Sequence, residues 1–64
     1  MKYSEMQSIE AGLKFKSPSG ILVETTGTTQ HIASHRIYVH EVAIAAGPDQ
    51  GQKFLLNLDV AQPQ

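Results

Sequence analysis

Apolar and polar residues alternate over short stretches of this chain, and glycine and proline separate the stretches. Residues 13–16 (Leu-Lys-Phe-Lys) alternate with the period of two that is typical of a half-buried strand. Residues 17–20 then place Pro18, with its fixed φ, beside the flexible Gly20, a pattern that indicates a tight turn. Residues 21–26 follow as a continuous, mostly β-branched run. Together these segments predict a first β-hairpin.

A second hairpin is predicted in the C-terminal half. Residues 36–46 form the longest segment without a turn former, and Ile37, Val39 and their neighbours are stiff β-formers with no N-cap box before them. We therefore predict a strand there, although the alanines at its end favour a helix. Residues 47–51 (Gly-Pro-Asp-Gln-Gly) predict the hairpin loop, and residues 52–58 return from it.

The remaining segments leave alternatives open. Residues 27–35 fit either a long loop or a short strand around positions 28–32. Ser4 with Gln7 three residues later predicts one or two helical turns over residues 4–11, and an extended strand over 8–11 is the alternative. Near the C-terminus, Asp59 is expected to cap a single turn through residues 60 and 61.

These elements predict a mainly β fold in a single small domain over residues 1–64, with residues 1–3 and 62–64 frayed. The fold is expected to be a small antiparallel SH3-like barrel or a curled sheet of four or five strands, with a short N-terminal helical turn. Residues 14–21, a strand that enters a tight turn and a β-branched return, resemble the opening hairpin of small SH3-like barrels. Such hairpins recur in unrelated β proteins, so the resemblance assigns no functional residue.

Size and composition limit how such a domain is stabilised. A chain of 64 residues buries only about 60% of its surface on folding, and domains this small often add disulfides, metals or a second subunit. Disulfides and thiolate metal sites are excluded because the sequence has no cysteine. The net charge of −1 provides no basic field for nucleic acid. No signal-like or membrane-length apolar run occurs, so we expect a cytoplasmic protein with no membrane partner.

The length of the segment 36–46 suggests a partner. Both of its faces are mainly apolar, which is typical of a strand that is covered on both sides. Its 11 residues would span roughly 36 Å, whereas a compact domain of this size is roughly 28 Å across. The strand must therefore bend within a closed barrel or protrude to meet a second subunit. The residues predicted to form an interaction surface are Ile37, Tyr38, Val39, Glu41 and Ala43.

The candidate catalytic and metal-binding residues give weak signals. His31, His35 and His40 are the only weak candidates for a metal site. His31 and His35 would share a face only on a helix, which the neighbouring threonines and isoleucines disfavour, and His40 is expected on a strand. Ser34 and His35 are adjacent, so in a strand they point to opposite faces and cannot act as nucleophile and base. We therefore expect no catalytic residue, no bound metal, no cofactor and no enzymatic activity.

Small β-barrels bind single-stranded nucleic acid through aromatic and basic side chains, so a nucleic-acid contact is an alternative for this chain. The residues that would form it are Lys14, Lys16, Arg36 and Tyr38. The hypothesis that the sequence favours is a non-catalytic protein-interaction module that self-associates or binds another protein. A single-stranded nucleic-acid-binding barrel is the first alternative, and a histidine-based metal-binding protein is the second.

Overall fold

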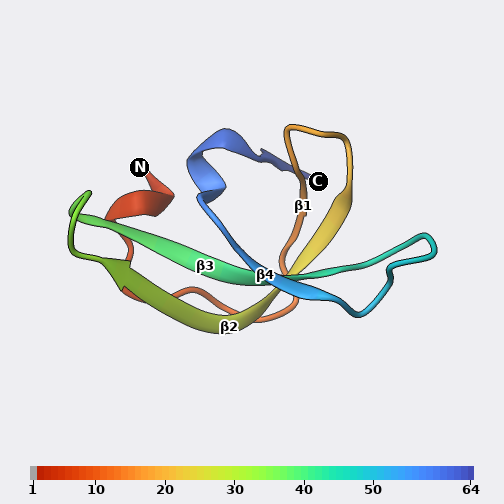
Figure 1. The fold of residues 1–64 in the computed structure, drawn as a ribbon, viewed down its shortest axis with the longest axis horizontal. Helices are drawn as coiled ribbons and strands as arrows, with labels where there is room; N and C mark the ends of the chain where they lie inside the picture. The colour runs from red at the N-terminus through yellow and green to blue at the C-terminus, as the bar shows by residue number, and fades with distance from the viewer. Residues whose placement is uncertain (1) are drawn as a thin grey trace.

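The computed structural model describes residues 2–64, which form five strands and two 3-10 turns (Figure 1). The elements in chain order are η1 (Tyr3–Glu5), β1 (Lys14–Lys16), β2 (Leu22–Ile32), β3 (Ile37–Ile44), β4 (Lys53–Leu56), η2 (Leu58–Val60) and β5 (Gln62–Pro63). Within residues 2–64, no helix is long and apolar enough to cross a membrane.

The strands form one antiparallel sheet in the order β4-β3-β2-β1-β5. The sheet is open and strongly curled, and β5 returns to pair with β1 (Figure 1). The predicted mainly β fold with four or five antiparallel strands is therefore confirmed as a curled sheet. The N-terminal helical turn is a single 3-10 turn, and residues 8–11 form neither the longer helix nor the strand that the sequence suggested.

Both predicted hairpins are confirmed. In the β1–β2 turn, the N–H of Gly20 donates to the carbonyl of Ser17 at 2.9 Å. In the β3–β4 loop, the N–H of Gly51 donates to the carbonyl of Ile44 at 2.9 Å, and the N–H of Ile44 donates to Gln52 at 2.8 Å. Turn formers at these positions define the ends of the strands.

The strand predicted over residues 36–46 is present but shorter, and the longest strand of the sheet is β2. The segment is a strand only over Ile37–Ile44. Strand β2 has 11 residues because it continues through Gly27 at φ 91°, and its register with β3 shifts between Thr25 and Thr29. Such a bulge bends a strand, so β2 fits within a molecule 33 Å long. Of the two alternatives for residues 28–32, the strand is correct.

The core lies on one side of the sheet, which we call the inner face. Its buried apolar residues are Ile9, Phe15, Val23, Val42 and Leu58. Tyr3 of η1 packs edge-on against Phe15, with ring centroids 5.3 Å apart. The N-terminal turn and η2 therefore contribute to the core together with the strands.

The two ends of the chain are held together by Asp59. Its carboxylate accepts hydrogen bonds from the N–H of Tyr3 at 2.6 Å and from the hydroxyl of Ser4 at 2.6 Å. The expected capping role of Asp59 was wrong, because Asn57 caps η2 by accepting from the N–H of Asp59. Near the two ends, Tyr3 lies in η1 and Gln62–Pro63 form β5, and Met1 lies outside the described residues.

Candidate functional site

The side of the sheet opposite the core, which we call the outer face, carries most of the predicted interaction surface. Alternation along β3 places Ile37, Val39, Glu41 and Ala43 on this face, because His40 and Val42 between them are buried on the inner face. All four are half-buried. Apart from Glu41, the β3 row on the outer face is apolar.

Tyr38 does not belong to this surface. It is the cross-strand partner of His31, and the two rings lie 4.8 Å apart at an angle of 39°. Tyr38 shares the parity of His40, which places it on the inner side of the sheet near the β2–β3 turn. The predicted surface therefore combined residues from two faces.

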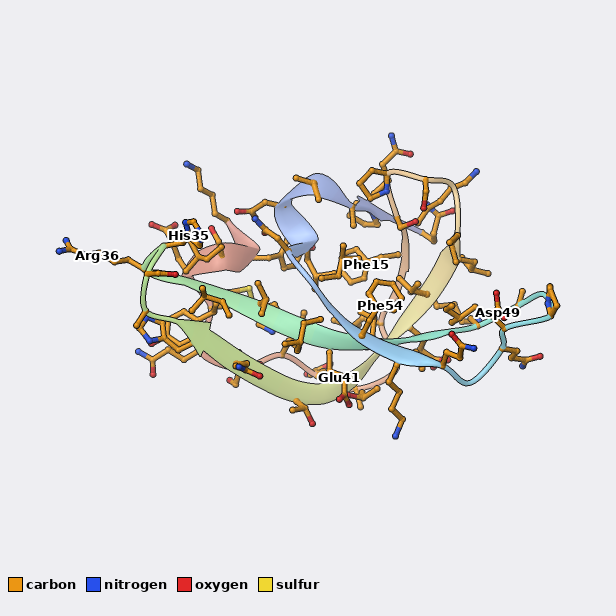
Figure 2. The ribbon with its side chains drawn as sticks, viewed as in Figure 1. Phe15, His35, Arg36, Glu41, Asp49 and Phe54 are labelled. Atoms are coloured by element: carbon orange, nitrogen blue, oxygen red, sulfur yellow. The ribbon has the colours of Figure 1, made fainter. Side chains whose placement is uncertain are left out.

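Strand β4 extends the outer face to the edge of the sheet. Leu55 is the cross-strand partner of Glu41 and is 42% exposed. Phe54 is the partner of Val42 and is 37% exposed, on the same side of the sheet as Phe15 (Figure 2). Because β4 is the last strand in the sheet order, it presents an apolar side chain on each face next to an open edge.

Glu41 is the acidic residue within the outer face. Its carboxylate accepts a hydrogen bond from the hydroxyl of Thr26 at 2.7 Å. The same hydroxyl lies 3.5 Å from the Glu41 carbonyl. This bond fixes the Glu41 side chain across β2 and β3, away from the β4 edge.

The structure does not bring the predicted nucleic-acid contacts together. Lys14 and Lys16 pair with Glu24 and Leu22 at the start of β2. Arg36 and Tyr38 lie at the opposite end of β2, beside the β2–β3 turn. The register separates the two pairs by about nine residues of β2, a distance of up to about 30 Å.

The three histidines are also dispersed. His31 stacks on Tyr38 and His35 lies in the exposed β2–β3 turn, whereas His40 is fully buried. The Nε2 atom of His40 lies 3.1 Å from the Tyr3 carbonyl, which only accepts, so we assign the proton to Nε2. Nδ1 then accepts from the hydroxyl of Thr29 at 2.8 Å. Within residues 2–64, no group of three or more histidine, aspartate, glutamate or cysteine side chains is placed to hold a metal ion.

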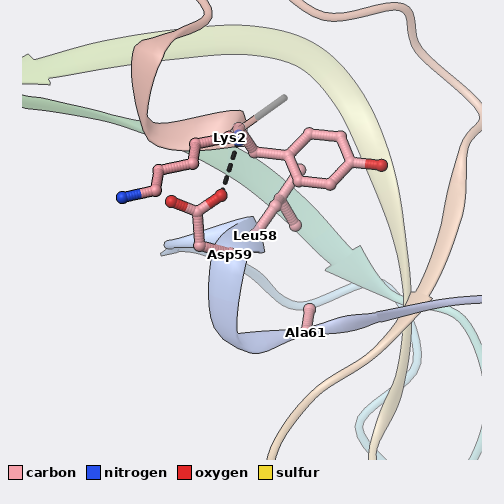
Figure 3. Close-up of a pocket in the computed structure, with 5 residues that line it drawn as sticks. Lys2, Leu58, Asp59 and Ala61 are labelled. Atoms are coloured by element: carbon pink, nitrogen blue, oxygen red, sulfur yellow. Dashed lines mark hydrogen bonds between the residues drawn. The ribbon is translucent and has the colours of Figure 1, made fainter.

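An open cleft of about 450 Å³ lies beside the Asp59 contact (Figure 3). Its lining residues are Lys2, Tyr3, Leu58, Asp59 and Ala61. The hydrogen bond from the Ser4 hydroxyl lowers the pKa of Asp59, and the N–H groups of Tyr3 and Ser4 add to this effect. Both carboxylate oxygens are thus used to hold η1, which is a structural role. Sequence reasoning missed this role because Ser4 and Asp59 are 55 residues apart.

No protein-family model, curated protein or solved structure matches this chain. The functional interpretation therefore depends on the geometry of the outer face and of the β4 edge.

Proposed function

We propose that the protein is a non-catalytic interaction module that binds a second copy of itself through the outer face and the β4 edge. The observation that carries the proposal is the open edge at β4, where Phe54 and Leu55 are 37% and 42% exposed on opposite faces of one strand. Edge strands present unpaired backbone groups that readily pair with another chain.

The size of the core supports a second copy as the partner. Among residues 2–64, five buried apolar residues form the core cluster. A core this small offsets the entropy cost of folding only narrowly, and small domains commonly gain stability by oligomerisation. Pairing at β4 would remove Phe54 and Leu55 from water. Burying the exposed remainder of such side chains contributes about 1 kcal/mol each.

Charge also favours self-association. The chain carries a net charge of −1, so two copies repel each other only weakly. The charged residue of β4 is Lys53, which is the first residue of the strand and lies two positions before Leu55. As part of this proposal we describe the curled sheet as SH3-like, and the return of β5 to pair with β1 supports that description.

The test is the mass of the full chain in solution. Light scattering coupled to size exclusion should give twice the chain mass of 7.0 kDa at high micromolar concentration. Leu55→Asp should shift the protein toward the monomer by at least about tenfold in dissociation constant, equivalent to about 1.4 kcal/mol. Ile21→Asp is the matched control, because Ile21 is 40% exposed but lies in the β1–β2 turn. A mass of 7.0 kDa up to millimolar concentration would overturn the proposal.

A further inference from the structure

We infer that two copies join edge to edge at β4, in antiparallel pairing about a two-fold axis at Leu55, so that one sheet continues into the other. This inference rests on the proposed self-association and specifies its geometry. Three features support it: the direction of the backbone N–H and C=O groups in β4, the side chains that would become cross-strand partners, and the poorer fit of the β5 and β2 edges for strand pairing.

The backbone of β4 has a defined parity. The N–H of Ile44 donates to the carbonyl of Gln52 at 2.8 Å, so the carbonyl of Gln52 points toward β3, whereas its N–H donates to the carbonyl of Asp49 at 3.1 Å. Hydrogen-bonding direction alternates along an antiparallel strand. The groups of Phe54 and Leu56 therefore also point toward β3, and those of Lys53 and Leu55 point outward to the open edge. Asn57, which is extended at φ −76° and ψ 107°, continues the outward series.

A two-fold axis at Leu55 uses all three outward residues. Leu55 then exchanges two hydrogen bonds with Leu55 of the second copy, and Asn57 donates to the carbonyl of Lys53 of the second copy. The Asn57 carbonyl is already engaged, because it accepts from the N–H of Val60 at 3.2 Å. An axis at Leu56 would form fewer hydrogen bonds. An axis at Phe54 would form as many, but it would place Lys53 opposite Leu55, whereas the axis at Leu55 places leucine opposite leucine.

The side chains match under the same axis. Cross-strand partners lie on one face, so Leu55 meets its own copy on the outer face and Phe54 meets Leu56 on the inner face. Lys53 falls opposite Asn57, so no like charges oppose each other. An aromatic–aliphatic pair and a leucine pair each contribute up to about 1 kcal/mol in a sheet.

The other edges are less suited to strand addition. In β5, the N–H of Gln64 donates to Lys14 at 3.0 Å, so Pro63 has the outward parity, and proline has no N–H to donate. The carbonyl of Pro63 also accepts from the Gln64 side chain at 3.4 Å. The second half of β2, residues 27–32, has no strand of the described residues 2–64 beside it on the β1 side, but this edge carries the polar residues Thr28 and Gln30 and not an apolar pair. A single apolar edge on each copy gives a closed dimer and not a filament.

Disulfide trapping tests the register. Because the sequence has no cysteine, each substitution introduces the only thiol of the chain. In the hydrogen-bonded pair at the axis, the two Cα atoms lie about 5.5 Å apart, which is within disulfide range. Leu55→Cys should therefore form a cross-linked dimer under mild oxidation. Lys53→Cys is the matched control on the same strand and face, because its two copies would lie about 13 Å apart.

A charge exchange tests the axis independently. Leu55→Lys and Leu55→Glu should each weaken the dimer at least about tenfold, because each variant opposes like charges across the axis. An equimolar mixture of the two should restore a dimer by light scattering. Circular dichroism must show a wild-type spectrum for each variant. If a charge variant unfolds, Leu55→Gln replaces it as the weakening substitution, and the separate cysteine test then decides the axis.

The outcomes separate the two proposals. A wild-type protein that is monomeric at all concentrations overturns the proposed function and this geometry together. A wild-type dimer in which Lys53→Cys cross-links as readily as Leu55→Cys overturns only the axis at Leu55. A mixture of folded charge variants that stays monomeric also overturns the axis.

Discussion

The buried imidazole of His40 provides the sharpest stability prediction. This side chain is fully buried on β3 and joins two segments that are far apart in the sequence. Its Nε2–H donates to the carbonyl of Tyr3 at 3.1 Å, and its Nδ1 accepts from the hydroxyl of Thr29 at 2.8 Å. Replacement by leucine fills the same space with an apolar side chain of similar size and removes both hydrogen bonds.

The magnitude follows from the two groups that His40→Leu leaves behind. A partly buried carbonyl or hydroxyl that loses its partner costs at least about 1 kcal/mol. The Tyr3 carbonyl still accepts the N–H of Met6 at 3.0 Å, which moderates its loss. We therefore expect His40→Leu to lower the free energy of unfolding by about 2 kcal/mol. That loss lowers the melting temperature of a domain this small by about 10 °C.

Urea unfolding followed by circular dichroism measures this change, and Thr29→Val is the matched control. Thr29→Val removes only the bond to Nδ1, so it should cost about 1 kcal/mol. In the double variant the two effects should not add, because both changes remove the same bond between His40 and Thr29. Amide exchange at Met6 should also accelerate in His40→Leu, because η1 loses one of its anchors. An unfolding free energy equal to or above that of the wild type in His40→Leu would refute the reasoning.

Three further predictions concern the ends of the chain, the bulge and the core. The pKa of Asp59 is lowered in the folded state, so its contribution to stability is full above the ordinary value of 3.8 and is lost as pH falls through the folded pKa. Acid titration should therefore destabilise the wild type more than Asp59→Asn. Parallel acid unfolding curves of the two proteins would contradict this prediction. Gly27→Ala should lower the free energy of unfolding by about 1 kcal/mol, seen as a lower urea midpoint, because φ is 91° there and the new methyl would lie 3.5 Å from the Ala11 side chain. Phe15→Ala removes a ring that is 2% exposed and should cost about 3–5 kcal/mol, enough to abolish the cooperative melting transition of so small a domain; a sharp transition in that variant would show that the core is elsewhere.

Local sequence patterns were sufficient for the hairpins and for the two faces of β3. Pro18 and Gly20 define the first turn, and the run from Gly47 to Gly51 defines the second, because the backbone conformations of turns depend on the residues within them. Alternation along β3 depends on the period of a strand, so Val39 and Val42 could be assigned to opposite faces before their neighbours were known.

Sequence patterns were misleading where one residue has two structural roles. Gly27 looks like the end of a strand, but here it forms a bulge inside β2 and lets that strand run for 11 residues. The bulge exists because β3 pairs with β2 on both sides of it, and that pairing cannot be read from residues 25–29 alone.

What the sequence determined by itself is therefore the local part of the protein: a β-rich chain, its turns and the two faces of the β3 strand. The tertiary structure alone decided which distant residues meet. Ser4 contacts Asp59 across 55 positions, and Tyr3 contacts His40 across 37. It also decided that β4 lies at the end of the sheet, with Leu55 exposed. Strand order depends on how the whole chain curls, and no short stretch of sequence encodes that path.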